Sequence, residues 1–244
     1  MSRSPGLFIA GTDTGVGKTR AAVSIVHALV LKGLKVAVMK PVAAGAAASA
    51  DGLRNDDALA LIEASNVGAE YALVNPYCLR APVSPHIAAQ EEGIGIEIER
   101  IARDFAALAR GAQCVVVEGA GGWLAPINDR QSMADIARAL ELPVVLVVGL
   151  RLGCLSHAQL TARAIEADGL RLGGWIANHI DPAFERLAQN VASLERLLEQ
   201  PPLAFIPYES AEGLRADPRA SRDPPPLAEP AADRLLALVG QGQA

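Results

Sequence analysis

Aromatic residues are scarce in this chain: they make up 4% of its 244 residues, although 51% of the sequence is hydrophobic. The core must therefore be built mainly from Ala, Val, Leu and Ile. That composition is typical of parallel strands buried on both faces, with Ala-rich helices packed against them. A chain of this length buries about 75% of its surface on folding. We therefore expect one α/β domain over residues 1–244.

Basic charge and long hydrophobic runs are also lacking. The net charge is −5, whereas proteins that bind nucleic acid or anionic membranes usually carry a basic face or a dense Lys/Arg run. The apolar stretch 7–10 is too short for a signal peptide, and the run 143–150 falls short of the ~20 residues of a membrane span. The three cysteines, Cys78, Cys114 and Cys154, show no metal-binding spacing. We predict a cytoplasmic protein that binds neither nucleic acid nor membrane.

Strand-like and helix-like segments alternate along the chain. Apolar runs predict strands at 7–10, 34–39, 114–117, 144–148, 175–177 and 203–206. Helical spacing predicts helices at 18–32, 56–64, 96–110, 133–140, 159–167 and 184–199, with a short final helix at 235–239. The Pro-rich segment 217–230 is expected to be an irregular surface connection. This alternation predicts an α/β fold with a doubly wound, mainly parallel sheet and helices on both faces.

The strongest motif is Gly-Thr-Asp-Thr-Gly-Val-Gly-Lys-Thr at 11–19. Backbone N–H groups of such a loop bind phosphates, its lysine reaches the terminal phosphates and its threonine hydroxyl binds Mg²⁺. Five residues separate Gly11 from Gly17, one more than in the usual pattern. A Gly-rich turn that merely opens a helix is disfavoured, because strand, loop, Gly-Lys-Thr and helix follow in the expected order. The motif predicts a P-loop NTPase and leaves the reaction open.

Three further charged sites have two interpretations each. Glu118 ends a buried run before a glycine cluster, so it is either a metal ligand or a surface acid at a strand end. Asp57 could bind a metal, but residue chemistry alone favours a helix start, with Asp56 as a possible N-cap and both acids in its first turn. Lys40 is equally compatible with an ordinary residue leaving the sheet and with a cation that stabilises a transferring phosphoryl group.

Taken in order, the motifs resemble those of the dethiobiotin synthetase family over about residues 5–215. Besides the phosphate loop with its five-residue spacing, they are Lys40-Pro41-Val42, Gly52-Leu53-Arg54-Asn55-x-Asp57-Ala58-Leu59, Ser84-Pro85-His86, Val117-Glu118-Gly119-Ala120-Gly121-Gly122, Leu152-Gly153-Cys154, Trp175-Ile176-Ala177-Asn178 and Ile206-Pro207.

The resemblance implies an ATP- and Mg²⁺-dependent ligase of biotin biosynthesis. In that family 7,8-diaminopelargonic acid and CO₂ form a carbamate, phosphoryl transfer from ATP gives a carbamic-phosphoric anhydride, and the second amine closes the ring. The family also implies a homodimer with substrate near the subunit interface, where segment 150–156 would donate backbone N–H groups to the substrate carboxylate.

The site residues carry over by position. The implied catalytic residues are Lys18, Lys40 and Thr14. The implied nucleotide-binding residues are Gly15, Val16, Gly17, Lys18, Thr19, Arg20, Asp57, Glu118, Gly119, Ala120, Gly121, Asn178 and Pro207, and the implied Mg²⁺ ligands are Thr19, Asp57 and Glu118. The chain departs from the family pattern at Ala44, Ser156 and Asn190, which puts details of substrate binding in doubt.

Three other interpretations compete with this ligase. A ParA/MinD-like nucleotide switch would share the fold, but such proteins carry a second lysine early in the loop, where this chain has Asp13. A corrinoid amide ligase usually adds a glutaminase domain, for which this chain is too short. An inactive paralogue is disfavoured by the intact Lys18, Lys40 and Glu118. His86 is expected to be structural rather than an acid–base group.

Overall fold

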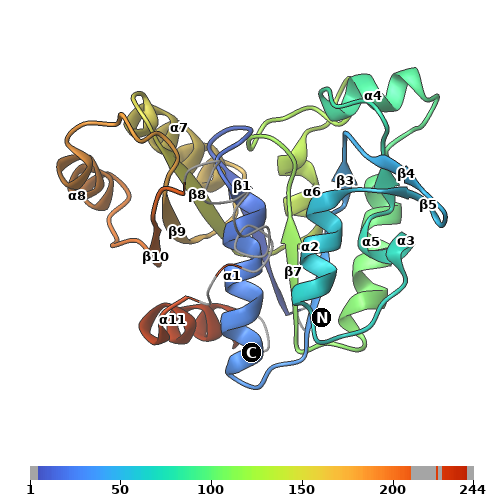
Figure 1. Cartoon of the computed structure of the whole chain (residues 1–244), viewed down its shortest axis with the longest axis horizontal. Helices are drawn as coiled ribbons and strands as arrows, with labels where there is room; N and C mark the ends of the chain where they lie inside the picture. The colour runs from blue at the N-terminus through green and yellow to red at the C-terminus, as the bar shows by residue number, and fades with distance from the viewer. Residues whose placement is uncertain (1–4, 210–223, 225–226, 241–244) are drawn as a thin grey trace.

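The computed structural model describes residues 5–209, 224 and 227–240. Its central feature is a six-stranded parallel sheet in the order β10-β9-β8-β1-β7-β2. The strands are β1 (Gly6–Gly11), β2 (Val36–Met39), β7 (Cys114–Glu118), β8 (Val144–Leu150), β9 (Leu172–His179) and β10 (Ala204–Ile206). Because β7 and β8 flank β1, the chain crosses over β1 between them (Figure 1). This confirms the predicted doubly wound sheet.

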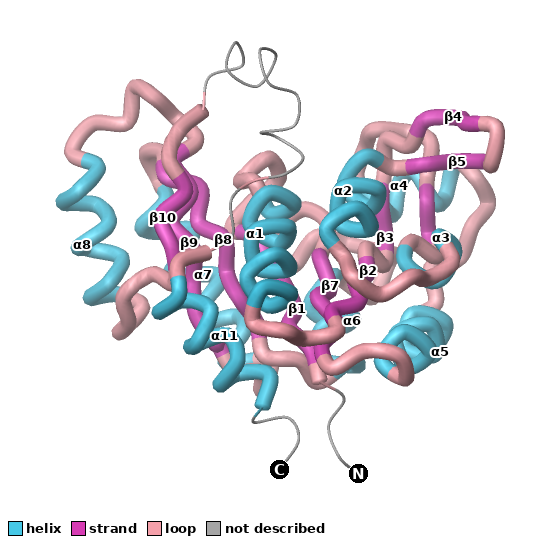
Figure 2. The backbone as a smooth tube through the Cα atoms, turned by 60° about the horizontal axis from the view of Figure 1, so that its bottom comes forward, coloured by secondary structure: helices cyan, strands magenta, loops and turns pink. Residues whose placement is uncertain are grey.

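Helices cover both faces of the sheet (Figures 1 and 2). One face carries α1 (Lys18–Leu31), α2 (Asp56–Ala64) and α11 (Glu229–Gly240). The other carries α5 (Ile98–Ala109), α6 (Met133–Leu140) and α7 (Cys154–Ala167), with α8 (Leu187–Leu197) packed against α7. Every residue of β1, β7 and β8 is buried, as expected for a parallel sheet between two helical layers.

Short elements surround the end of β2. Strand β3 (Val42–Ala43) pairs in parallel with β6 (Tyr77–Cys78), and β4 (Ala47–Ser49) forms a hairpin with β5 (Gly52–Arg54). The helices α3 (Tyr71–Val74) and α4 (Pro85–Glu91) complete this region. The sequence predicted none of these elements. Strands of two or three residues and helices of four or seven are too short to show a hydrophobic period.

The six predicted strands and the predicted helices are all present among the described residues, with shifted ends. Strand β9 is longer than the predicted 175–177, α7 begins at Cys154 rather than 159, and α11 is longer than the predicted 235–239. Most of the Pro-rich segment 217–230 lies outside the described residues, and its last two residues belong to α11. Within the described part of the chain, no helix is both long and apolar enough to span a membrane.

Candidate active site

The carboxyl ends of the parallel strands meet at one edge of the sheet, at the top of Figure 1. The phosphate loop follows β1, Lys40 follows β2, and Glu118 is the last residue of β7. Asn178 lies near the end of β9, and Pro207 follows β10. The sheet topology therefore brings together residues that are far apart in the sequence.

The phosphate loop ends at Gly17, which is the N-cap residue of α1 with φ 83°. A Cβ at this position would lie 2.1 Å from Nδ2 of Asn178. Both the left-handed backbone and this close approach require glycine here. Asn178 Nδ2 donates to the carbonyl of Val16 at 2.7 Å, and this hydrogen bond connects β9 to the phosphate loop. The free N–H groups at the start of α1 make this loop a suitable anion site.

The two lysines at this edge have different environments. Lys18 is buried, and its Nζ donates to the backbone carbonyl of Asp13 at 3.0 Å. Burial, followed by repulsion from Lys40, lowers the pKa of Lys18 to about 8. Within the described part of the chain no carboxylate forms an ion pair with Lys18, so an anionic ligand would stabilise its charged form.

Lys40 forms an ion-pair cluster with two carboxylates, that of the buried Glu118 and that of the partly exposed Asp57. Its Nζ lies 2.6 Å from Glu118 Oε1 and 2.8 Å from Asp57 Oδ2. Burial alone would lower the pKa of Lys40, but the charges of Glu118 and Asp57 outweigh it and raise the pKa. Lys40 therefore stays charged beside the phosphate loop, and it is not an ordinary residue leaving the sheet.

Asn55 explains why Asp57 can join this cluster. The N-cap residue of α2 is Asn55, whose side chain accepts from the backbone N–H groups of Asp57 and Ala58, at 3.1 and 3.3 Å. The suggestion that Asp56 caps this helix is thus wrong. With the cap supplied by Asn55, the Asp57 carboxylate is free to accept from Lys40 at 2.8 Å.

Thr19, Asp57 and Glu118 fit a magnesium ion. Thr19 Oγ1 donates to Glu118 Oε1 at 2.9 Å, whereas Glu118 Oε2 is buried with no hydrogen-bond partner. No group of three or more His, Cys, Asp or Glu suited to a metal occurs among the described residues. Two carboxylates and a hydroxyl are an oxygen-only set that suits Mg²⁺, which keeps waters and phosphates as its other ligands.

A cavity of about 710 Å³ opens next to this cluster. Its charged end is formed by Lys18, Lys40, Asp57 and Glu118. Its apolar walls are formed by Ala43, Ala44, Pro82, Val83, Pro85, Ala120 and Ala125, and Thr14, Gly15, Gly17, Thr19, Ser84 and Gly121 complete the lining. We call this space the phosphate-side cavity. It can hold a molecule with one anionic or polar end and an aliphatic body.

A second cavity of about 580 Å³ lies on the other side of Gly17, Thr19 and Asp57, which line both spaces. It is further lined by Arg20, Asp56, Ala60, Asn178, His179, Ile180, Tyr208 and Glu209. We call it the base-side cavity. The carbonyl of Val16 can only accept, so it fixes which side-chain atom of Asn178 is Nδ2 and uses one of its two hydrogens; Oδ1 and the second N–H can still bind a ligand.

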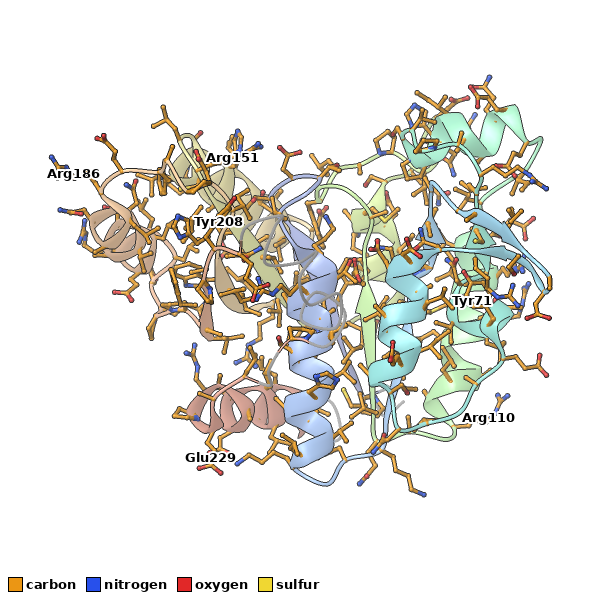
Figure 3. All side chains as sticks on the ribbon, in the orientation of Figure 1. Tyr71, Arg110, Arg151, Arg186, Tyr208 and Glu229 are labelled. Carbon is orange, nitrogen blue, oxygen red and sulfur yellow. The ribbon has the colours of Figure 1, made fainter. Side chains whose placement is uncertain are left out.

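Arg20 belongs to the base-side cavity. Its guanidinium pairs with Glu209 at 2.7 Å and donates to the carbonyl of Pro207 at 3.4 Å. Tyr208, which is labelled in Figure 3, packs against His179 with ring centroids 5.8 Å apart. Sequence reasoning missed His179, Tyr208 and Glu209, and the only indication was their position next to Asn178 and Pro207.

The other predicted residues have distinct places. Thr14, Gly15, Ala120 and Gly121 line the phosphate-side cavity, whereas Val16 is buried beneath the loop and the carbonyl of Gly119 lies 3.5 Å from Lys40 Nζ. Of the three departures from the family pattern, Ala44 lines the phosphate-side cavity. Ser156 and Asn190 line neither of the two cavities.

Segment 150–156 contacts the phosphate loop through an ion pair between Arg151 and Asp13. Asp13 Oδ1 also accepts from the backbone N–H of Thr14 at 2.7 Å. Figure 3 shows Arg151 at the same edge of the molecule as the loop. Leu152, the next residue, is 91% exposed.

The fold and the phosphate loop together define a P-loop nucleotide-binding protein. The family described as an AAA domain matches residues 5–212. The solved MinD cell division protein of Aquifex aeolicus superposes with a TM-score of 0.58 and 18% identity, covering 97% of each chain. At this identity the likeness shows the fold alone.

Closer relatives narrow the assignment. The chain is 50% identical over 204 residues to the ATP-dependent dethiobiotin synthetase BioD of Xanthomonas euvesicatoria pv. vesicatoria, covering 84% of this chain and 91% of that protein. It is also 50% identical over 201 residues to the protein of the same name from Vibrio vulnificus, covering 82% and 88%. The chain belongs to the ATP-dependent dethiobiotin synthetase family, a family of ligases.

Proposed function

We propose that this protein forms dethiobiotin from 7,8-diaminopelargonic acid, CO₂ and ATP, as a Mg²⁺-dependent cyclo-ligase of biotin biosynthesis. The observation that carries the proposal is the contact of the buried Lys40 with Glu118 and Asp57, beside the phosphate loop. This cluster opens into a cavity with apolar walls. Such a site suits the transfer of a phosphoryl group to a molecule with an aliphatic chain.

The reaction balances in three steps. One amine of the substrate adds to CO₂ and loses a proton, giving a carbamate. A carbamate oxygen attacks the γ-phosphorus of ATP, and ADP leaves. The second amine then attacks the carbamate carbon and loses a proton, and phosphate leaves as the ring closes.

Lys18 and Lys40 stabilise the negative charge that gathers where carbamate and phosphate meet. The transfer needs positioning and charge stabilisation more than covalent help from the protein. Lys40 is held in place by its two carboxylates, whereas Lys18 is free to turn from the Asp13 carbonyl to a phosphate. Thr14, on the cavity wall, offers a hydroxyl at the same junction.

Thr19, Asp57 and Glu118 would hold Mg²⁺. The unpartnered Glu118 Oε2 and its contact with Thr19 support this assignment. When bound, the ion neutralises phosphate charge and orients the γ-phosphate.

The nucleotide would lie across both cavities, since Gly17, Thr19 and Asp57 line each of them. Residues 15–19 and 119–121 would face the phosphates. Asn178 would face the base, with Pro207 close by. Asn178 offers Oδ1 as an acceptor and the second hydrogen of Nδ2 as a donor, which suits the amino group and a ring nitrogen of adenine.

We further propose a cytoplasmic homodimer in which segment 150–156 reaches the partner's substrate site. The strong exposure of Leu152, at 91%, supports an apolar contact at this segment. The molecular mass in solution tests this point, and a monomer that retains full activity would contradict it.

The test of the function is ATP turnover with Mg²⁺ and bicarbonate, with and without 7,8-diaminopelargonic acid, with dethiobiotin followed by mass. We expect dethiobiotin and ADP in a one-to-one ratio, and little ADP without the diamine. The fold shared with MinD would also suit a nucleotide switch. ATP turnover that is indifferent to the diamine would contradict the ligase and favour that switch.

A further inference from the structure

The segment Ser84-Pro85-His86 has an unusual hydrogen bond at the start of α4. Ser84 is the N-cap residue of this helix, yet its side chain makes no capping hydrogen bond. Its Oγ instead lies 3.0 Å from Nδ1 of His86. A serine N-cap normally contributes about 1 kcal/mol through its bond to the helix backbone. Ser84 does not make this stabilising bond to the helix backbone, and its hydroxyl bonds to the His86 side chain instead.

Ser84 lines the phosphate-side cavity. Three hydroxyls line this space, and two of them, Thr14 and Thr19, belong to the phosphate loop and its helix. Ser84 stands apart from them, next to Val83 and Pro85 on the apolar wall. Within the described lining it is therefore the one neutral polar side chain outside the phosphate-binding part.

The wall that carries Ser84 is fixed to the strand segment opposite. Gly45 N–H donates to the carbonyl of Ala81 at 3.1 Å, and a Cβ on Gly45 would touch Pro82 at 3.2 Å. Residues 43–45 and 82–85 thus pack together around the cavity. A polar group on this wall is held at a set position relative to the aliphatic body of a bound molecule.

We propose that Ser84 binds an amine of the substrate and that His86 positions the Ser84 hydroxyl for this role. The proposal rests on the proposed function and names a further residue for it. When Nδ1 of His86 accepts the hydroxyl hydrogen, Oγ has only lone pairs to offer to the cavity. A hydroxyl held in this way accepts from an N–H group and does not donate to a carboxylate. The pair therefore selects a substrate that carries an amine at this point of the chain.

A purely structural role would give a different pattern of effects. If the bond only stabilised α4, its loss would lower the melting temperature and weaken all ligands alike. If Ser84 binds the substrate, its loss raises KM for the diamine and leaves KM for ATP unchanged.

The test is a double-mutant cycle with Ser84→Ala and His86→Phe, assayed by dethiobiotin formation. We expect KM for the diamine to rise about tenfold in Ser84→Ala, as for the loss of one hydrogen bond to a polar ligand. His86→Phe should give a similar rise, and the double variant no more than either alone. His86→Asn, which keeps an acceptor near the position of Nδ1, should restore most of the affinity.

Ser132→Ala is the matched control, because Ser132 is an N-cap residue in a capping box on α6 and lines neither cavity. It should lower the melting temperature and leave KM for the diamine unchanged. An unchanged KM for the diamine in Ser84→Ala, or an equal rise in KM for ATP, overturns the role of Ser84 alone. A wild-type protein that forms no dethiobiotin in the same assay overturns the proposed function as well.

Discussion

The two cavities meet at Gly17, Thr19 and Asp57, but they are built in different ways. The phosphate-side cavity contains charged side chains that form ion pairs with one another, with Lys40 between Glu118 and Asp57. The base-side cavity depends on single contacts between distant segments, such as Asn178 with Val16 and Arg20 with Glu209. Charge has to be fixed where a phosphoryl group moves, whereas a base needs mainly a shaped surface. Changes on the first side should therefore alter catalysis, and changes on the second should alter nucleotide affinity.

The largest effect is expected from the two lysines. Lys18→Ala and Lys40→Ala should each reduce turnover by about 10³-fold or more, the scale of losing one preorganised charge-stabilising group. Lys40→Ala also leaves Glu118 buried without its cation, so its stability should fall by about 3–5 kcal/mol. Turnover is measured alongside thermal unfolding.

The exposed Lys35 provides the matched control, and Lys35→Ala should leave turnover unchanged. Lys18 has no carboxylate partner in its hydrogen bond, so Lys18→Ala separates lost catalysis from lost stability. Wild-type-like turnover in either folded lysine variant would remove that lysine from the mechanism.

A pair of glycine variants tests whether the two cavities are coupled at Gly17. Gly15 and Gly17 have similar left-handed backbones, with φ 73° and 83°, but a Cβ on Gly15 meets nothing within 4 Å. Gly15→Ala should weaken ATP binding about fivefold, through backbone strain of about 1 kcal/mol. Gly17→Ala should weaken ATP binding at least tenfold more than Gly15→Ala does, because the new Cβ would displace Asn178. Calorimetric titration with ATP gives both values, and equal losses would show that the contact with Asn178 is unimportant.

Arg20 distinguishes binding of the base from binding of the phosphates. Arg20→Ala should raise KM for ATP about fivefold, since a partly exposed ion pair contributes about 1 kcal/mol or less. Because Arg20 contacts Glu209 and Pro207, inhibition by tripolyphosphate, which has no base, should stay unchanged. Glu209→Gln should give a smaller change of the same kind. An equal loss of tripolyphosphate affinity would show that Arg20 binds the phosphates rather than the base.

The smallest effect is expected from the cysteines, which are all free thiols. Replacing Cys78, Cys114 and Cys154 by Ser should change turnover by less than about twofold, because no step of the transfer needs a thiol. Stability should fall chiefly through Cys114, which is fully buried in β7 and whose pKa burial raises to about 12. Loss of the chemical step in a folded triple variant would contradict this expectation.

Much of the phosphate side could be predicted from the sequence. The phosphate loop is contiguous, and Glu118 follows a continuous apolar run, so local pattern and strand order were enough. Lys40 had two equal interpretations until the fold placed it between two carboxylates. The role of Asp57 was harder still to predict, because only the folded helix shows that Asn55, and not an aspartate, caps α2.

Most of the base side could not be predicted. Arg20 and Glu209 lie near opposite ends of the matched sequence, and no local pattern links them. The short elements β3 to β6, α3 and α4 were missed because tertiary contacts, not periodicity, define them. They matter for function, since α4 carries the Ser84–His86 pair.

Transfer of the phosphoryl group to a carbamate oxygen beside the Lys40 cluster can be followed with ¹⁸O-labelled bicarbonate, by measuring the label in the released phosphate by mass. A control without protein sets the reaction times, which must be shorter than label exchange with water. We expect one oxygen from bicarbonate in each phosphate released with dethiobiotin. Dethiobiotin formed alongside unlabelled phosphate would mean that water receives the phosphoryl group, and it would exclude transfer to the carbamate.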